Sequence, residues 1–126
     1  MIVFRDDVLY TSSNEWAKNL DGIIRVGIDD YSQSSLGDIV YAEISPVNTH
    51  VSAGKSFGSI EATKSVIEIN APVSGVIVRV NDSVINSPQL INHDPFGEGW
   101  LIEIEPDNIS ELDTLMNAEA YKDFIR

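Results

Sequence analysis

The sequence predicts an all-β domain, a compact sandwich or barrel with a few short helices, from three observations. Short runs in which apolar and polar residues alternate recur along the chain, and turn-forming residues separate them. Helix-like patterns are few and short. A hydrophobic fraction of 43% in 126 residues fits one packed core. We therefore expect a single domain over residues 1–126, with its β core at about 8–106 and C-terminal helices at about 108–125.

Four strand-like runs lie outside the centre of the chain, at residues 22–28, 38–44, 76–80 and 100–105. In the first three, apolar side chains recur two residues apart, as one buried face of a strand requires. The fourth alternates apolar and acidic residues until Pro106. The residues predicted to share a face are Ile24, Val26 and Ile28; Val40, Ala42 and Ile44; and Val76, Val78 and Val80.

Three short helices are predicted. Residues 29–36 begin with acidic residues and end before Gly37, a common helix stop. Near the C-terminus, Ser110 can cap one helix and Asn117 a second. We expect both C-terminal helices to pack against the sandwich, and we assign them no chemistry. Their apolar stripes are Leu112, Leu115 and Met116 in the first and Tyr121, Phe124 and Ile125 in the second.

The segment from Gly58 to Pro72 predicts a β-hairpin with a lysine at its turn. Apolar and polar residues alternate on both sides of Thr63-Lys64-Ser65. A lysine at a hairpin turn stands in water on a rigid support, as an enzyme that modifies one amine needs. The simpler interpretation is a solubilising charge at an exposed turn, so the hairpin alone does not decide between them. The alternating apolar residues are Ile60 and Ala62 before the turn and Ile67, Ile69 and Ala71 after it.

Around this lysine the sequence resembles a known family. Glu61-Ala62-Thr63-Lys64-Ser65 is similar to the lipoylation hairpin of the glycine cleavage system H proteins. Further blocks follow in the order of the family, and the resemblance covers the chain roughly from Val8 to Phe124. Asn14 stands where the family usually has histidine. The other blocks are Tyr10–Trp16, Val26–Tyr31, Leu36–Tyr41, Ala71–Gly75 and Asn92–Leu101.

The resemblance implies a lipoyl-domain-like β-sandwich, of the barrel-sandwich hybrid type, with lipoic acid joined by an amide to the Lys64 amine. Such a protein is a carrier and not an enzyme. It takes an aminomethyl group from a pyridoxal-phosphate glycine decarboxylase, the P protein, to a tetrahydrofolate-dependent aminomethyltransferase, the T protein. A dihydrolipoamide dehydrogenase, the L protein, then reoxidises it. We expect a monomer that serves glycine catabolism and one-carbon metabolism.

Four further residues are expected to have roles, Glu61 because of its charge near Lys64 and the other three because of the resemblance. A free lysine amine is protonated near neutral pH, so a lipoate ligase or lipoyl transferase must supply an activated acyl group. Glu61 is expected to help that enzyme recognise the hairpin, and a solvated strand residue is the alternative interpretation. Ser13, Glu15 and Glu68 are expected to form a recess that holds the arm and the carried amine.

Composition argues against several other functions. Twenty acidic residues against eight basic ones give a net charge of −12, which argues against partners such as nucleic acid and anionic membrane surfaces. No apolar run approaches the length that crosses a bilayer. The short acidic start lacks the features of a secretory or transit peptide. A bacterial cytoplasmic protein is therefore expected, and a mature mitochondrial matrix form is the alternative.

No residue pattern points to catalysis or to a metal site. The chain has no cysteine, and its two histidines, His50 and His93, are expected at the surface. Gly97-Glu98-Gly99 does not lead from a strand into a helix, which argues against a dinucleotide-binding loop. The acidic residues near the C-terminal strand lack the spacing of a calcium-binding loop; they are Asp94, Glu98, Glu103, Glu105 and Asp107.

Other carrier functions stay open at this point. A lipoyl domain of a 2-oxoacid dehydrogenase complex would share the hairpin lysine, but such domains are shorter and belong to long multidomain chains. A lipoyl relay protein and an unmodified acidic adaptor are further alternatives. A biotin carrier fits less well, because its lysine usually lies between methionines. The early Glu15-Trp16 and late Asp94–Trp100 blocks favour the H-protein family.

Overall fold

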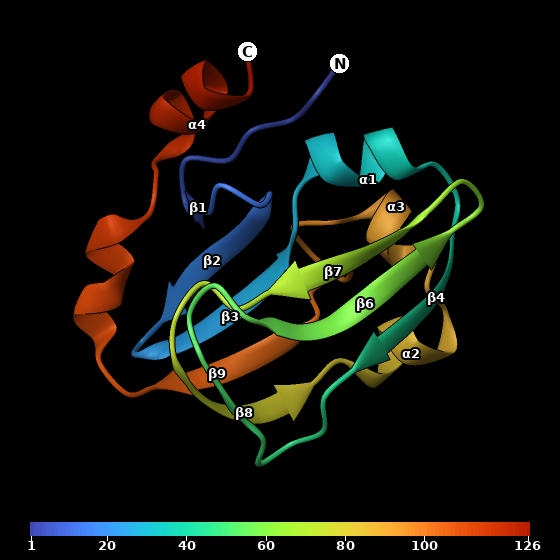
Figure 1. Ribbon diagram of the computed structural model, residues 1–126. Coiled ribbons are helices and arrows are strands. Elements are labelled where there is room, and N and C mark those ends of the chain that lie inside the picture. Colours follow the sequence, from blue (N-terminus) through green and yellow to red (C-terminus); the bar gives the residue numbers. More distant parts are fainter.

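Two antiparallel β-sheets pack against each other, and short helices lie around their edges (Figure 1), in a computed structural model that describes residues 1–126. The predicted all-β sandwich with a few short helices is confirmed, although the sheets do not close into a barrel. The larger sheet contains, in order, β1 (Leu9–Tyr10), β2 (Glu15–Leu20), β3 (Ile23–Ile28), β9 (Ile102–Pro106), β8 (Gly75–Val80) and β5 (His50–Val51). The smaller sheet contains β4 (Ile39–Ile44), β6 (Ser56–Ala62) and β7 (Val66–Asn70).

The main hydrophobic core lies between the two sheets. Ile24, Val26 and Ile28 point into it from β3 and are fully buried, which confirms the predicted alternation. Ile60 from β6 and Ile69 from β7 belong to the same core. The inner faces of both sheets are therefore held together by apolar burial, the main stabilising contribution in a domain of this size.

A β-bulge in β4 changes which side chains face the core. The register against β6 shifts between Ile39 and Tyr41, so Val40 is the extra residue, and its side chain is 48% exposed. The prediction that Val40 shares an inner face with Ala42 is therefore wrong. Ile39 takes the inward position instead and is fully buried.

A second bulge affects β8 in the same way. Its register against β9 shifts between Ile77 and Arg79. Ile77 is the fully buried residue of this strand, whereas Val76, Val78 and Val80 are only partly buried. The prediction of a core-facing valine row is therefore wrong for Val76 and Val78, whereas Val80, beyond the bulge, packs against the main core.

The first helix ends at Leu36 as predicted and begins one residue later than predicted. It is α1 (Asp30–Leu36), and the Asp29 side chain caps it by accepting a hydrogen bond from the Ser32 N–H at 2.8 Å. Two further short helices, α2 (Asp82–Asn86) and α3 (Leu90–His93), have too few residues to show a helical period in the sequence. No helix has both the length and the apolar character that crossing a membrane requires.

The C-terminal segment forms a 3₁₀ helix, η1 (Ile109–Thr114), and then α4 (Ala118–Ile125). The prediction that Ser110 caps the first of these is wrong. Asn108 is the capping residue, because its side chain accepts a hydrogen bond from the Ser110 N–H at 3.0 Å. The cap therefore lies two residues earlier than predicted. The helix that follows is a 3₁₀ helix, which is more tightly wound than an α-helix.

The predicted cap and apolar face of α4 agree better with the structure. Asn117 caps the helix, since its side chain accepts a hydrogen bond from the Ala120 N–H at 2.9 Å. Tyr121 is fully buried, but Phe124 is 54% exposed. In the preceding segment, Leu112 packs against the main core as expected.

A second, smaller hydrophobic cluster joins α4 to β1 and β2. The rings of Tyr10 and Tyr121 stack in parallel with their centroids 4.4 Å apart. Trp16 is fully buried, and its Nε1–H donates to the Pro95 carbonyl at 3.0 Å. Gly27 faces Trp16 across the strands, and a Cβ there would come within 2.6 Å of the indole ring. The cluster contains Val8, Tyr10, Trp16, Trp100, Ala118 and Tyr121.

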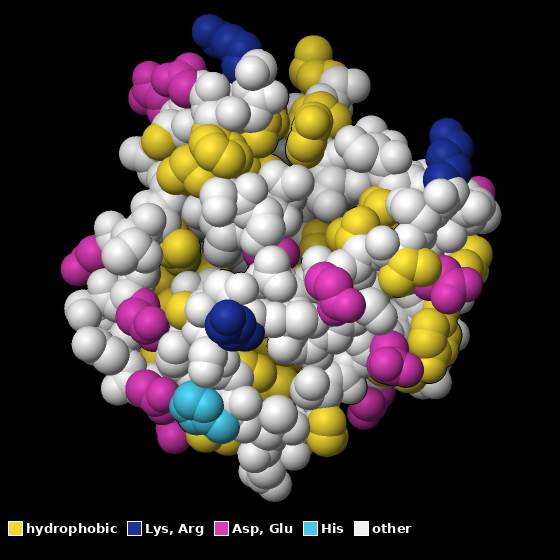
Figure 2. All heavy atoms as spheres, viewed as in Figure 1, with side chains coloured by type: hydrophobic (Ala, Val, Ile, Leu, Met, Phe, Trp, Pro, Cys, Tyr) yellow, Lys and Arg dark blue, Asp and Glu magenta, His cyan; other side chains and the backbone are white.

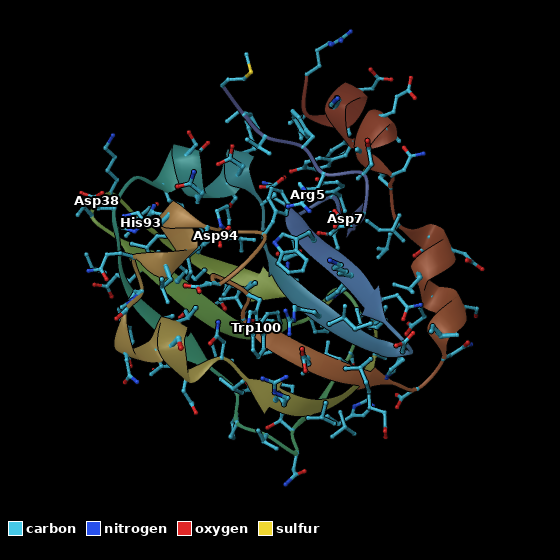
Figure 3. The ribbon with its side chains drawn as sticks, turned by 180° about the vertical axis from the view of Figure 1, so that it is seen from behind. Arg5, Asp7, Asp38, His93, Asp94 and Trp100 are labelled. Carbon is cyan, nitrogen blue, oxygen red and sulfur yellow. The ribbon has the colours of Figure 1, made fainter.

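The larger sheet also carries a charged cluster around Trp100, which Figure 3 shows from behind. The guanidinium carbons of Arg25 and Arg79 lie 4.6 and 5.0 Å from the Trp100 ring centroid. Both arginines also donate to the Glu103 carboxylate, at 2.9 and 3.1 Å. These contacts explain why Glu103 is buried within the apolar and acidic alternation of β9.

Candidate functional site

The hairpin turn holds Lys64 away from the body of the protein. The register of β6 and β7 pairs Glu61 with Val66, and the Ala62 N–H closes the turn on the Ser65 carbonyl at 2.8 Å. The Thr63 N–H donates to the carbonyl of Asp38, at the start of β4, at 3.1 Å. The prediction of two strands that turn at Thr63-Lys64-Ser65 is confirmed, and Figure 1 shows the turn at the far end of the β6–β7 hairpin.

Lys64 is exposed, and the residues that fix its position lie below it. Ile60, Ala62 and Ile69 point from the hairpin into the main core. The ion pairs of the protein involve other basic residues, so the Lys64 amine has no carboxylate partner within the chain. A lysine with a rigid base and a free amine suits covalent attachment of a long acyl group, and the structure therefore fits a lipoyl group at this position.

Glu61 lies on the outer face of the hairpin, next to the turn. Its cross-strand neighbours are Tyr41 on β4 and Val66 on β7, and all three side chains are exposed. In Figure 2, hydrophobic and acidic side chains alternate over this sheet, and a basic side chain projects at the hairpin turn. Glu61 and these two apolar side chains therefore form an exposed surface beside the turn.

Ser13 and Glu15 lie together at the other end of β7, as predicted. Glu15 is only 1% exposed. Its Oε1 accepts hydrogen bonds from the hydroxyls of Ser13 and Thr11, both at 2.6 Å, and its Oε2 accepts one from the Asn70 N–H at 3.1 Å. Burial raises the pKa of Glu15, and these hydrogen bonds offset that effect only in part.

A cleft of about 520 Å³ opens beside Ser13, between the C-terminal segment and the two sheets. Its lining combines hydroxyl groups with apolar side chains, and the Thr11 and Ser13 hydroxyls in it bond to the buried carboxylate of Glu15. Such a cleft can accept a chain with an apolar body and a polar end. Its lining residues are Tyr10, Thr11, Ser12, Ser13, Ala53, Gly54, Ala71, Pro72, Thr114, Leu115, Met116 and Phe124.

Glu68 does not join this group. It is exposed on β7, and its carboxylate accepts a hydrogen bond from the Ser56 hydroxyl at 2.6 Å. The structure instead adds two residues that the sequence analysis missed, Thr11 and Asn70. Asn70 is two positions after Glu68 on the same strand, but no pattern in the sequence brings its N–H to Glu15.

The loop that carries Ser13 is tied to α4. Asn14 has a positive φ of 75°, which asparagine tolerates better than most residues. Its Oδ1 accepts a hydrogen bond from the Tyr121 hydroxyl at 2.8 Å. The buried Oδ2 of the nearby helix cap Asp29 has no hydrogen-bond partner, and burial raises the pKa of Asp29. The C-terminal helix thereby fixes one side of the recess, the group formed by Thr11, Ser13, Glu15 and Asn70.

The remaining polar groups do not form a second site. His50 and His93 are both exposed, and His50 bonds to Asp107 at 2.7 Å. In Figure 3, His93 lies near Asp38, at the end of the molecule that carries the hairpin turn. No three residues of metal-binding type lie close enough to hold a metal ion.

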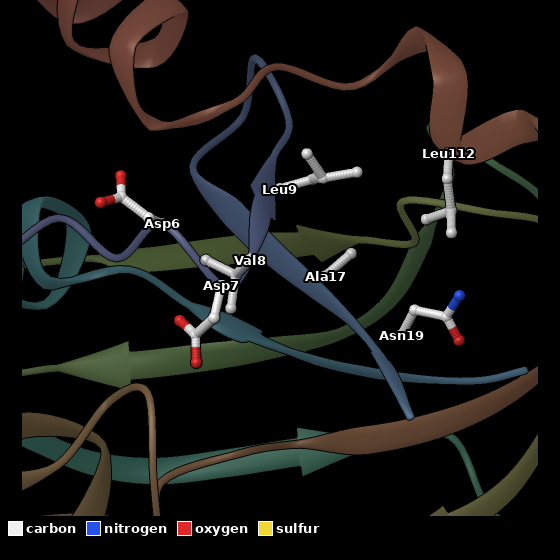
Figure 4. Close-up of a pocket in the computed structure, with 7 residues that line it drawn as sticks. All are labelled: Asp6, Asp7, Val8, Leu9, Ala17, Asn19 and Leu112. Atoms are coloured by element: carbon white, nitrogen blue, oxygen red, sulfur yellow. The ribbon is translucent and has the colours of Figure 1, made fainter. Parts of the chain in front are cut away.

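A smaller cleft lies between the N-terminal segment and η1, with a volume of about 260 Å³ (Figure 4). Leu9, Ala17 and Leu112 form its apolar part. Of its two carboxylates, Asp7 is already paired with Arg5 and Lys18, at 3.0 and 3.3 Å. This cleft therefore offers no unpaired charge on that side.

Comparison with known proteins gives a consistent result. The model of the family described as glycine cleavage H-protein matches residues 8–126. The chain is 47% identical over 120 residues to a glycine cleavage system H protein of Anaeromyxobacter sp. strain K, covering 95% of this chain and 94% of the relative. It is also 47% identical over 122 residues to the one of Carboxydothermus hydrogenoformans, covering 97% and 94%. The crystal structure of a glycine cleavage system H protein from Mycobacterium marinum superposes with a TM-score of 0.89 at 36% identity, covering 95% of this chain and 97% of that one.

Proposed function

Because this chain belongs to the glycine cleavage H-protein family, the lipoyl carriers of the glycine cleavage system, we propose that Lys64 is the residue that carries its lipoyl group. The carrier is not itself an enzyme. The exposed, unpaired amine at a rigid hairpin turn is the single observation that supports Lys64 most directly. One other lysine, Lys55, lies next to this hairpin. It directly precedes β6, at the end of the hairpin opposite to the turn.

The lipoyl group supplies a disulfide that can be reduced while it accepts a one-carbon amine unit. The chain's own contribution is to position that group, because Ile60 and Ala62 anchor the strand that leads to Lys64. Glu61 is proposed to serve as a recognition charge for the attaching enzyme, a lipoate ligase or lipoyl transferase. Its exposed carboxylate beside the turn supports this role.

The recess beside the cleft is proposed to hold a cationic amine at the end of the arm. Glu15 already accepts hydrogen bonds at both oxygens, so it would act mainly through Ser13. The Ser13 hydroxyl donates its proton to Glu15 and its oxygen accepts from the Asn70 amide, which leaves one lone pair to accept from an ammonium group. The Asn70 side chain approaches Ser13 at 3.4 Å and supports its orientation. Glu68 is proposed to act as a second, more exposed carboxylate on the way to the recess.

Membership in the family implies interaction with other components of the glycine cleavage system. We propose that these are the glycine decarboxylase, the aminomethyltransferase and the dihydrolipoamide dehydrogenase. Tethering raises the local concentration of the carried unit at each of them, and the net charge of −12 favours fast encounter with basic docking surfaces. We further propose that the protein works in the bacterial cytoplasm, and the bacterial origin of the relatives supports this.

Intact-protein mass spectrometry tests the attachment site. The unmodified protein, incubated with lipoate, ATP and a lipoate–protein ligase, should gain the mass of one lipoyl group, and peptide mapping should place it on Lys64. Lys64→Arg should abolish the gain completely, because arginine keeps the charge but has no primary amine. Lys55→Arg is the matched control, an exposed lysine at the other end of β6, and should be modified normally. Full modification of the Lys64→Arg variant would refute the assignment.

A further inference from the structure

A groove that is separate from the recess begins at Tyr41, the cross-strand neighbour of Glu61 beside the Lys64 turn. It runs along β4, an edge strand that pairs only with β6, and the end of β8 and α2 form its other side. Its volume is about 390 Å³. The residues that line it are Tyr41, Ala42, Glu43, Ile44, Pro46, Val47, Val80, Asp82 and Ile85.

The walls of this groove hold apolar side chains that the fold leaves in solvent. Tyr41, Val47 and Ile85 are 51%, 45% and 40% exposed. Single exposed apolar residues are ordinary, but several around one groove are typical of a surface that a partner covers. At one end of the groove the β4 bulge causes this exposure, because it turns the side chains of Val40 and Tyr41 outward in succession.

The charges at the groove have a single sign. Glu43 and Asp82 line it and no basic residue does. Glu61, the cross-strand neighbour of Tyr41, adds a third carboxylate on the side of the turn. The complementary surface is one in which an apolar side chain lies between lysines or arginines.

The position of the groove relative to Lys64 favours the acylating enzyme as its partner over the enzymes that act on the carried unit. The Asp38 carbonyl bonds to Thr63 in the turn, and Tyr41 follows Asp38 by three strand residues, or about 10 Å. An enzyme that acylates Lys64 must bring its reacting centre to within one lysine side chain of the turn, and the Tyr41 end of the groove is then within reach of that enzyme's surface. Enzymes that act on the carried unit can meet it at the end of a long arm instead.

On these grounds we infer that the groove is the docking site for the enzyme that acylates Lys64, through a surface of that enzyme in which an apolar side chain is flanked by basic residues. The inference rests on the proposed attachment at Lys64. It assigns to Tyr41, Ile85 and Glu43 a role in recognition that is separate from any later use of the lipoyl group.

Initial rates of modification of the unlipoylated protein by a purified lipoate–protein ligase test the apolar part. Tyr41→Ser and Ile85→Ser should each lower kcat/KM by about five- to twenty-fold, mainly through KM, as loss of a central interface side chain does. Ile109→Ser is the matched control, since Ile109 is 45% exposed but lies on η1. It should stay within about twofold of the unchanged protein, and all variants should keep the melting temperature because these side chains are exposed.

Salt dependence tests the charged part. The rate should fall between about 50 mM and about 500 mM NaCl, and the double variant Glu43→Gln, Asp82→Asn should show a smaller fall. Glu119→Gln, on α4, should keep the full dependence.

Three outcomes separate the possibilities. Normal modification of folded Tyr41→Ser and Ile85→Ser proteins would overturn the docking site. Normal modification together with slower turnover in a reconstituted glycine cleavage system would assign the groove to another component, and would also overturn it. Failure of the unchanged protein to gain lipoyl mass at Lys64 would instead refute the proposed function itself.

Discussion

The hairpin turn and the recess, the two parts of the candidate site, are built in opposite ways. Lys64 stands in solvent without an ion pair, and the side chains that fix its position lie on the inner face of the hairpin. Glu15 is 1% exposed and its own oxygens accept three hydrogen bonds. The position of Lys64 is fixed by the core packing of neighbouring residues, so its own side chain stays free. The position of Glu15 is fixed by hydrogen bonds to its own carboxylate oxygens. Substitutions should therefore separate function from stability at the turn and couple them at the recess.

The largest expected effect on stability is in the smaller hydrophobic cluster, at the residue that follows Glu15 in β2. Trp16→Ala removes a fully buried indole and its hydrogen bond to Pro95, and should lower the free energy of unfolding by about 3–5 kcal/mol. Lys64→Arg, at the turn, should change it by less than about 0.5 kcal/mol. Urea denaturation followed by circular dichroism measures both. A similar loss in the two variants would contradict the contrast between these regions.

A smaller effect is expected where α4 is tied to the recess. Tyr121→Phe keeps the stacked ring but removes the hydroxyl that donates to Asn14. It leaves a polar oxygen without its donor, so the free energy of unfolding should fall by about 1–2 kcal/mol. Amide hydrogen exchange should also become faster in residues 11–15. Tyr31→Phe is the control, because the Tyr31 hydroxyl has no hydrogen-bond partner in the protein, and the loss should be absent there.

The smallest effect is a change in the pH dependence of stability. Burial raises the pKa of Glu15 above its ordinary value of 4.5, so the folded protein keeps this proton where the unfolded chain has lost it. The stability of the unchanged protein should therefore decline as the pH rises through the interval between the two pKa values. Glu15→Gln cannot titrate, so its stability relative to the unchanged protein should increase as the pH rises above about 4.5 and then level off.

Urea denaturation at a series of pH values from about 4 to about 7 measures this difference. Asp29 also has a raised pKa, but it is present in both proteins and does not contribute to the comparison. Ser13→Ala should have the opposite effect, because it removes a hydrogen bond that favours the charged carboxylate and so extends the decline to higher pH. If the free energies of unfolding of the unchanged protein and Glu15→Gln changed with pH in the same way, folding would not raise the pKa of Glu15, which would contradict this prediction. When the lipoyl group carries an aminomethyl unit, Glu15→Gln should release ammonia faster than the unchanged protein.

The difference between these regions also explains what the sequence could predict. The hairpin follows from local alternation, because its apolar residues occur at every second position on both sides of the turn. The proximity of Ser13 and Glu15 follows from a two-residue spacing in one motif, together with the family resemblance. Their contact with Asn70 could not be predicted from spacing, since it joins residues 55 and 57 positions apart in the chain.

The errors in the fold have local physical causes. Alternation assumes an unbroken strand, and the bulges at Val40 in β4 and before Arg79 in β8 break it, so each changes which residues face inward. Serine and asparagine are equally good caps, so the sequence does not distinguish Ser110 from Asn108 as the residue that caps the first C-terminal helix. The groove beside β4 is a result of the first bulge, and periodicity alone therefore did not reveal it.

The strand β7 connects both halves of the site, and its length fixes their separation. It begins next to the turn that carries Lys64 and ends at Asn70, whose N–H bonds to Glu15. Five residues in an extended strand put Val66 and Asn70 about 13 Å apart. Inserting one residue would invert every side chain beyond it, and inserting two would keep the faces but move the turn outward by about 7 Å. This strand thus acts as a ruler for any group that is attached at one end and sheltered at the other.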